Sequence, residues 1–191
     1  MTKLLITAAT ALAMSLPTIA HAQQANILIV DSDRVMSDCT ACKSAASQLQ
    51  AKQAALRARA QTLQTQLQAE GKPIQAAVDA LNGKAPDAAL QAKITAYQTK
   101  ERNAQQELST GTRSLESTAA NVQQQIGNKI VGVVEQIRAR RGAAIVLSKN
   151  STIANDTGID VTTEVLTNLN TALPAVSVTP LPQSAQTPQG R

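Results

Sequence analysis

The sequence predicts a mostly α-helical protein in which a long antiparallel coiled-coil hairpin stands on a small β-sheet base. Two long stretches carry apolar residues at steps of 3, 4 or 7, which is the spacing of a coiled-coil seam. Short apolar runs with β-branched residues flank these stretches and predict strands. The 191 residues include one Tyr but no Phe or Trp. Because large aromatic side chains dominate burial in most cores, this composition favours helices that meet along narrow seams.

The two arms of the hairpin are expected over residues 41–81 and 88–141. The tip falls at residues 82–87, where Gly83 can end one helix and Pro86 can start the next. Because this connection is short, the arms must run antiparallel. At a rise of about 1.5 Å per residue, the hairpin would reach roughly 60–80 Å.

Gly71 and Pro73 interrupt the first arm, and Gly111 interrupts the second. Pro73 lacks a backbone donor, so we expect a kink there. Two interpretations stay open: these positions let the arms flex around bound proteins of different size, or they are tolerated irregularities in an exposed hairpin. Placing the tip at residues 71–73 instead fits less well, because the second arm would then be much longer than the first.

Two strands are expected at residues 27–31 and 143–147, which flank the hairpin and should therefore pair at its base. Residues 152–154 follow a turn signal and are expected to add a third, short strand. So small a sheet cannot bury enough apolar area alone, and self-association at the base would supply the missing burial.

Shorter segments complete the predicted base. Residues 32–38 are expected to form a connection with at most one helical turn, and either Asp38 or Thr40 is expected to cap the first arm. Asp160 is expected to cap a terminal helix over residues 161–173.

Both ends of the chain differ in composition from the rest. Lys3 precedes an apolar run over residues 4–16, and an A-x-A sequence ends at Ala22, so we expect a signal peptide that is cleaved after Ala22 and directs export to the periplasm. The last 18 residues hold four prolines among Ser, Thr and Gln and are expected to be a disordered tail. The expected division is a signal peptide at 1–22, a β-rich base at 23–38 and 142–173, a helical hairpin at 39–141 and a tail at 174–191.

Positive charge gathers on the hairpin. Between Lys43 and Arg113 there are ten basic and five acidic residues, an excess of +5. Such an excess attracts anionic surfaces or acidic chains, although a solvated helix face would look the same in the sequence. Because we expect the chain to be exported, we do not expect it to bind nucleic acid.

Cys39 and Cys42 are spaced as in redox C-x-x-C motifs, but no thioredoxin-like βαβ pattern surrounds them. Lys43 follows where covalent haem attachment would need His. The lone histidine, His21, lies in the signal peptide, so a four-ligand zinc site is not expected. In an oxidising compartment we expect a local disulfide between the two cysteines, with a thiol oxidoreductase as an alternative.

Other enzymatic chemistry finds no support in the sequence. There is no G-x-x-x-x-G-K run for ATP, and there is no Ser/His/Asp set or metal-ligand cluster. We therefore expect neither a cofactor nor an enzyme.

A further pattern runs through most of the chain, over roughly residues 27–173. It consists of the first strand, the segment Asp31-Ser32-Asp33-Arg34-Val35, the sequence Lys43-Ser44-Ala45, the Ala- and Gln-rich hairpin, and an ending with Gly142-Ala143-Ala144-Ile145-Val146-Leu147, Asn155-Asp156 and Asp160-Val161-Thr162-Thr163-Glu164-Val165-Leu166. In this order of segments the chain resembles the Skp/OmpH family of periplasmic chaperones. Its cysteine pair, its lack of Phe and its proline-rich tail depart from the best-known members.

The resemblance implies a homotrimer whose sheets join into one base, with three hairpins around a cavity. It also implies an ATP-independent holdase, a chaperone that binds unfolded outer-membrane β-barrel proteins and prevents their aggregation. Lipopolysaccharide or an anionic membrane surface would be a further partner. The alternative is an envelope adaptor coiled coil without chaperone activity. The basic residues that would face bound proteins are Arg57, Arg59, Lys72, Lys84, Lys93, Lys100 and Arg102. The apolar residues that would form the trimer base are Ile27, Ile29, Ile145, Val146 and Leu147.

Overall fold

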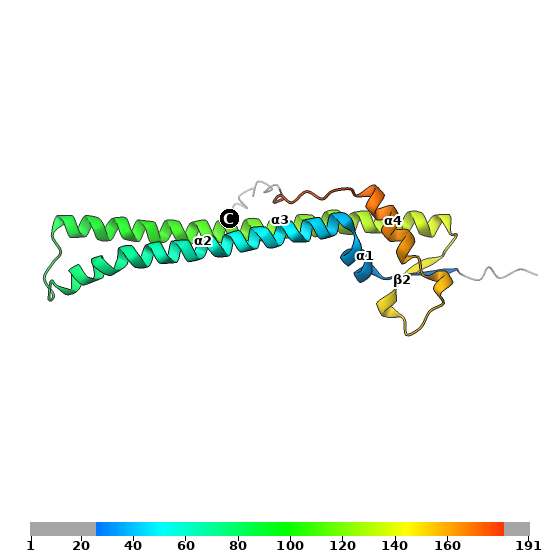
Figure 1. Ribbon diagram of the computed structural model, residues 1–191, viewed down its shortest axis with the longest axis horizontal. Coiled ribbons are helices and arrows are strands. Elements are labelled where there is room, and N and C mark those ends of the chain that lie inside the picture. Colours follow the sequence, from blue (N-terminus) through cyan, green and yellow to red (C-terminus); the bar gives the residue numbers. More distant parts are fainter. Residues whose placement is uncertain (1–25, 182–191) are drawn as a thin grey trace, which may run out of the picture.

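The computed structural model describes residues 26–181 and consists of two long helical arms on a small base (Figure 1). The mostly α-helical hairpin with a two-stranded sheet is confirmed. The expected signal peptide and residues 182–191 of the expected tail lie outside the described residues. The elements are β1 (Ile27–Val30), α1 (Ser32–Asp38), α2 (Thr40–Asp79), α3 (Ala88–Arg140), β2 (Ile145–Ser148), the short 3₁₀ helices η1 (Lys149–Ser151) and η2 (Thr157–Ile159), and α4 (Thr162–Ala172).

The base sheet pairs the two ends of the hairpin in parallel. Its register places Ile27 opposite Ile145, and the pairing continues to the ends of both strands. The other edge of β1 is taken by the segment before α4, where the Val161 N–H donates to the Ile29 carbonyl oxygen at 2.9 Å. Both edges of β1 therefore have hydrogen-bonded neighbours.

The prediction of a third strand at residues 152–154 is wrong. The backbone N–H and the hydroxyl of Thr152 both donate to the Lys149 carbonyl oxygen, at 3.0 and 2.8 Å. These bonds close a local turn, after which Ile153 is fully exposed. Asp160, and not this segment, bridges to β1, because the chain returns to the sheet only just before α4.

The core lies where the helices cover one face of this sheet. Side chains alternate along a strand, so Leu28 and Val30 point to the same face, and both belong to the buried cluster. The largest fully buried side chains that the helices α1, α3 and α4 add to this cluster are Val35, Ile137, Val165 and Leu169. The structured base is therefore a small four-element core and not the sheet alone.

The corner between α1 and α2 corrects two expectations. Residues 32–38 form a helix of seven residues, longer than one turn. Neither Asp38 nor Thr40 caps the first arm. Cys39 occupies the cap, and its sulfur accepts the Cys42 N–H at 3.2 Å. Asp38 ends α1, and the Thr40 N–H instead donates to the Asn170 side chain of α4 at 2.9 Å.

The turn between the arms lies where the sequence predicts it, but α3 begins after Asp87 and not at Pro86. Asn82 and Gly83 adopt positive φ angles of 49° and 85° after the end of α2. Asp87 then caps α3, because its carboxylate accepts the Leu90 N–H at 2.7 Å. A positive φ is accessible to Gly and tolerated by Asn, so this turn follows directly from the residue types.

The hairpin glycines have a packing role that the sequence did not indicate. A Cβ atom at Gly71 would lie 2.8 Å from the Tyr97 hydroxyl oxygen of α3. One at Gly111 would lie 2.7 Å from a methyl carbon of Leu56 on α2. Each glycine therefore lets a side chain of the opposite arm approach its backbone. Pro73 lies inside α2, which runs as one helix from Thr40 to Asp79.

Residues 174–181 correct the expectation of a disordered tail. After α4 the chain runs back along α3, as the orange to red segment in Figure 1 shows. Val176 and Val178 pack against the core cluster, and side chains of α3 bond the backbone. Proline and polar residues prevent a helix or sheet here but do not prevent packing in an extended conformation.

Substitution of the glycines by alanine tests this packing. Alanine is favoured over glycine in a helix interior by about 1 kcal/mol, so Gly127→Ala, where the new Cβ meets no atom within 4 Å, should stabilise the protein by up to that amount. Gly111→Ala should gain clearly less, because Leu56 must move. Thermal unfolding followed by far-UV circular dichroism compares the two, and equal gains would contradict the close contact.

Candidate functional site on the hairpin and base

The arms of the hairpin pack thinly over most of their length. Among residues 46–117, only Ala104 is buried. The expected seam residues of this region, such as Leu63 and Leu67 of α2, are half-buried. Leucine side chains at a helix–helix seam that remain partly in contact with water offer apolar surface to another molecule. The distal hairpin is therefore the first candidate surface for binding.

Two adjoining clefts lie between the arms in this region. The cleft nearer the tip has a volume of about 490 Å³ and the next one about 370 Å³. Glu70 and Lys100 line both clefts, and their side chains form an ion pair of 2.6 Å across the arms. The other residues that line the cleft nearer the tip are Ala69, Pro73, Ile74, Ala77, Leu90, Lys93, Ala96 and Tyr97. This lining is mostly apolar and includes three charged residues, Glu70, Lys93 and Lys100.

Tyr97, the single aromatic residue, lies in this cleft over Gly71. Partial burial raises the pKa of Tyr97, and the nearby carboxylates of Glu101 and Glu70 raise it further. The phenol is therefore neutral at physiological pH.

Three of the seven basic residues named from the sequence have polar partners on the hairpin. Arg59 of α2 donates twice to Glu107 of α3, at 2.6 and 3.0 Å, and this pairing lowers the pKa of Glu107. Lys100 pairs with Glu70, and Arg102 donates to the Thr99 hydroxyl at 3.0 Å. Exposed ion pairs contribute little to stability, but Arg59–Glu107 and Lys100–Glu70 join the two arms, whereas the Arg102–Thr99 bond lies within α3.

The remaining four basic residues carry unneutralised charge. Within residues 26–181, none of their side chains has a carboxylate within 4.0 Å. These residues are Arg57, Lys72, Lys84 and Lys93. Lys93 also lines the tip cleft, so charge and apolar surface meet there. The structure thus separates Arg59 and Lys100, which pair across the arms, from the other predicted basic residues, which can meet a partner; among these, Arg102 bonds only the Thr99 hydroxyl of its own helix.

The second candidate surface is the outer face of the base sheet. The register and the strand alternation place Ile27, Ile29, Ile145 and Leu147 on the face opposite the helices. Three of these are partly exposed, with exposed fractions of 37% for Ile27, 45% for Ile145 and 37% for Leu147. Within residues 26–181, β2 pairs with β1 alone, so its outer edge also offers free backbone groups.

Val146, the fifth residue named for the base, lies on the other face. It is half-buried and packs against the core cluster with Leu28 and Val30. A charge at Val146 would therefore disturb the core of one chain as well as any interface. Ile145 and Leu147 are the residues that report on the outer face.

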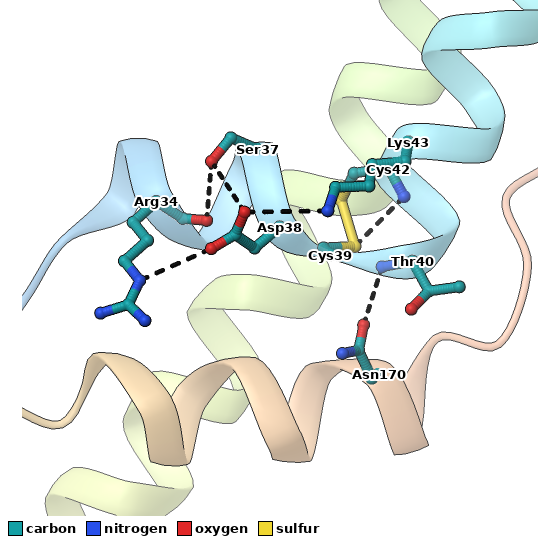
Figure 2. The surroundings of a disulfide bond; sticks show 8 residues. All are labelled: Arg34, Ser37, Asp38, Cys39, Thr40, Cys42, Lys43 and Asn170. Atoms are coloured by element: carbon teal, nitrogen blue, oxygen red, sulfur yellow. Dashed lines mark hydrogen bonds and ion pairs between the residues drawn. A yellow bond between two sulfur atoms is a disulfide. The ribbon is translucent and has the colours of Figure 1, made fainter.

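Cys39 and Cys42 are joined by a disulfide at the start of α2 (Figure 2). The exposed fraction is 0% for Cys39 and 6% for Cys42, so a second thiol has little access to either sulfur. In Figure 2, α4 lies beside this corner, and its Asn170 bonds the neighbouring Thr40. The buried bridge is therefore a local structural link at the start of α2, and the contact with α4 is made by Thr40.

Asp160 ties the start of α4 to the sheet. Its carboxylate accepts bonds from the Lys149 ammonium at 3.0 Å and from the backbone N–H of Thr162 at 3.0 Å. The Thr162 hydroxyl also donates to Asp160 and accepts the Asp31 N–H at 2.9 Å. Burial alone would raise the pKa of Asp160, but the bonds from Thr162 and Lys149 outweigh it and lower the pKa to about 2.

Glu164 holds α4 to the end of α3. It pairs with Arg140 and with Arg141, the latter at 2.6 Å. The hydrogen bonds from Arg140 and then Arg141 lower the pKa of Glu164. Both arginines lie at the end of the second arm, and only the tertiary structure brings a carboxylate of α4 to them.

In the described part of the chain, no helix is long and apolar enough to cross a membrane. Over the same residues, no group of three or more His, Cys, Asp or Glu side chains could hold a metal ion.

The network around Asp160 predicts a pH dependence of stability. Folding lowers the pKa of Asp160 from its ordinary value of 3.8 to about 2. The ionised carboxylate therefore stabilises the folded state fully above pH 3.8, and this stabilisation disappears as the pH falls towards 2. The shift corresponds to roughly 2 kcal/mol. Asp160→Asn should lower the unfolding free energy at neutral pH by up to that amount and make it less sensitive to acid.

Urea unfolding at neutral pH and at about pH 3 measures both effects. Asp79→Asn, at the end of α2 far from the base, is the matched control. An Asp160→Asn protein with the stability and acid sensitivity of the unchanged chain would contradict the role of this network.

Comparisons with known proteins agree with this architecture. A family model described as outer membrane protein (OmpH-like) matches residues 26–169. No curated protein matches the chain. The fold is similar to the crystal structure of a candidate outer membrane chaperone (OmpH-like) from Caulobacter crescentus CB15, with a TM-score of 0.68 and 16% sequence identity, covering 84% of this chain and 94% of that one. At this identity the similarity establishes the fold.

Proposed function

Because this chain belongs to the OmpH-like family, we propose that it is an ATP-independent holdase chaperone of the periplasm. Its clients, the unfolded proteins that it binds, would be outer-membrane β-barrel proteins on their way to the membrane. The chain would act by binding and not by catalysis. The expected signal peptide supports export, and export argues against nucleic acid as a partner.

The observation that carries this proposal is the half-buried seam of the distal hairpin with its clefts. Unfolded barrel strands alternate apolar and polar side chains and so need many weak apolar contacts with water nearby. An open seam of Leu, Ile and Ala supplies such contacts without a single deep pocket. No ATP is needed, since each contact is weak enough to exchange.

Charge supports the capture of acidic chains. Arg57, Lys72, Lys84 and Lys93 would attract acidic client segments and speed their association, and added salt would weaken this effect. The positive charge of the same residues would also attract lipopolysaccharide or an anionic membrane surface.

The outer face of the base supports assembly into a homotrimer. Ile27, Ile145 and Leu147 together with the free edge of β2 form an apolar, hydrogen-bonding surface that a second copy can cover. Three hairpins on one base would hold a client at several points. The high effective concentration of linked sites then raises the overall affinity without any strong single contact.

Two other functions use the same fold. An envelope adaptor would keep the hairpin and its charges but would not hold unfolded proteins. A thiol oxidoreductase would need accessible sulfur, and the burial of Cys39 and Cys42 disfavours it.

An aggregation assay tests the holdase proposal. A urea-denatured outer-membrane barrel protein is diluted into buffer with or without the mature chain, and light scattering is followed without ATP. Suppression at a near-stoichiometric ratio of trimer to client is expected, and a Cys39→Ala, Cys42→Ala protein that is still folded should suppress equally. Unchanged scattering with a folded, assembled protein would contradict the holdase function and favour the adaptor.

Assembly is tested at the outer face of the sheet. Leu147→Asp should dissociate the trimer, because it places a charge in the proposed interface while Leu147 is partly exposed in one chain. Ile153→Asp is the matched control, since Ile153 is fully exposed outside the sheet. Light scattering coupled to size-exclusion chromatography gives the mass, and a trimeric Leu147→Asp protein would show that assembly uses another surface.

A further inference from the structure

The segment after α4, residues 174–181, is bound to α3 through its backbone. The Gln125 side chain donates to the Ser177 carbonyl oxygen and accepts the Ser177 N–H, both at 3.0 Å. Asn121 donates to the Thr179 carbonyl oxygen at 3.0 Å, and the Leu181 N–H donates to the Ser117 hydroxyl at 3.0 Å. We call residues 174–181 the strap, and Ser117, Asn121 and Gln125 the ladder.

The ladder side chains bind the backbone of the strap and not its side chains. All four of these bonds end on backbone groups of the strap. The carboxamide of Gln125 offers one donor and one acceptor side by side, as the peptide group of a neighbouring strand would. Every polypeptide carries these backbone groups at the same spacing, so the ladder places little demand on sequence.

The spacing of the two partners explains the fit. The ladder residues recur every four positions, which is about 6.0 Å along a helix. The strap residues that they bond recur every second position, which is about 6.4–6.8 Å along an extended chain. The two repeats therefore stay in step over the three contacts at 125, 121 and 117, and any extended segment that runs antiparallel to α3 would meet them in the same way.

The strap also has the side-chain pattern of a barrel strand. Val176 and Val178 are half-buried against the core cluster, while Ser177 and Thr179 are exposed. This alternation of apolar and polar residues is that of transmembrane β-strands. Beyond it, a hollow of about 430 Å³ beside Pro180 and Leu181 is lined by Thr110, Arg113, Ser114 and Ser117, so the surface of α3 continues to offer space toward the tip.

We propose that the ladder face of α3 is a binding site for extended polypeptide, which the strap occupies in cis and an unfolded client segment can take over. This inference rests on the proposed holdase function for the identity of the client. Because the strap is tethered at Leu173, which is buried, its effective concentration is high. A free segment in solution competes poorly, whereas a client already held by the arms competes from the same assembly.

A peptide-binding experiment with the full mature chain tests the site without a client. The probe is a fluorescein-labelled peptide with the sequence of residues 174–181, followed by fluorescence anisotropy. The variant Val176→Asp, Val178→Asp should release the strap, because its carboxylates cannot stay beside the apolar cluster. It should bind the probe at least about tenfold more tightly than the unchanged chain, which holds its own strap.

The ladder is tested in the same background. Adding Gln125→Ala removes both bonds to Ser177 and should weaken probe binding by about tenfold. Gln124→Ala, on an exposed position of the same helix, is the matched control and should leave binding unchanged. Circular dichroism verifies that each variant is folded. Equal binding by the released and unchanged chains, or by the Gln125→Ala and control proteins, would overturn the site.

Hydrogen exchange in the unchanged protein tests the exchange with a client and needs no variant. The amides of Ser177 and Leu181 are protected by α3. They should exchange faster when a urea-denatured outer-membrane barrel protein is bound. Undiminished protection while the client is bound would overturn the inference and leave the holdase function standing. If the chain binds the probe but does not hold barrel proteins, the ladder is a binding site and the holdase proposal is wrong.

Discussion

The parallel pairing of β1 with β2 is the constraint on which the rest of the structure depends. It joins the two ends of the hairpin, and the bond from the Ala144 N–H to the Asn26 carbonyl oxygen, 2.8 Å long, continues it beyond the strands. With both ends held, the two long helices must leave the base together and turn back at the tip. The pairing also creates the face with which Leu28 and Val30 join the buried residues of the helices in one core cluster. Asp160 completes the arrangement by fixing α4 against the second edge of β1.

Away from that core, the hairpin is held by contacts that leave much of its apolar surface near water. The close approaches at Gly71 and Gly111 and the pairs Arg59–Glu107 and Lys100–Glu70 set how the arms meet. None of these contacts buries a continuous seam. Stability therefore concentrates at the base, and the distal arms remain available for binding. This division agrees with a protein that holds others without unfolding itself, because a client can cover apolar surface that the fold does not need.

The strap links these two regions. It begins at the buried end of α4, follows α3 toward the arms and is recognised through its backbone. Recognition of this kind suits a chaperone, since clients share a backbone and not a sequence. A covalently attached occupant would keep the ladder covered against stray segments and would yield to a chain that the arms already hold. In this proposal the arms hold a client first, and the ladder then binds one of its extended segments in place of the strap.

The sequence by itself determined the local elements: both arms from their apolar repeat, the tip from Gly83, and the two strands from their β-branched runs. It also placed the two cysteines at a helix start, where they form a disulfide. The sequence missed the Cys39 cap, although it is local, because the side chains that usually cap helices carry oxygen. Three features appeared only in the tertiary structure, namely the ordered strap, the second edge of β1 and the packing at Gly71 and Gly111. The physical reason is the separation along the chain between the residues that interact. A helix or turn follows from residues a few positions apart, whereas these features join segments that are distant in the chain, and a proline-rich sequence looks disordered until the helix that binds it is in place.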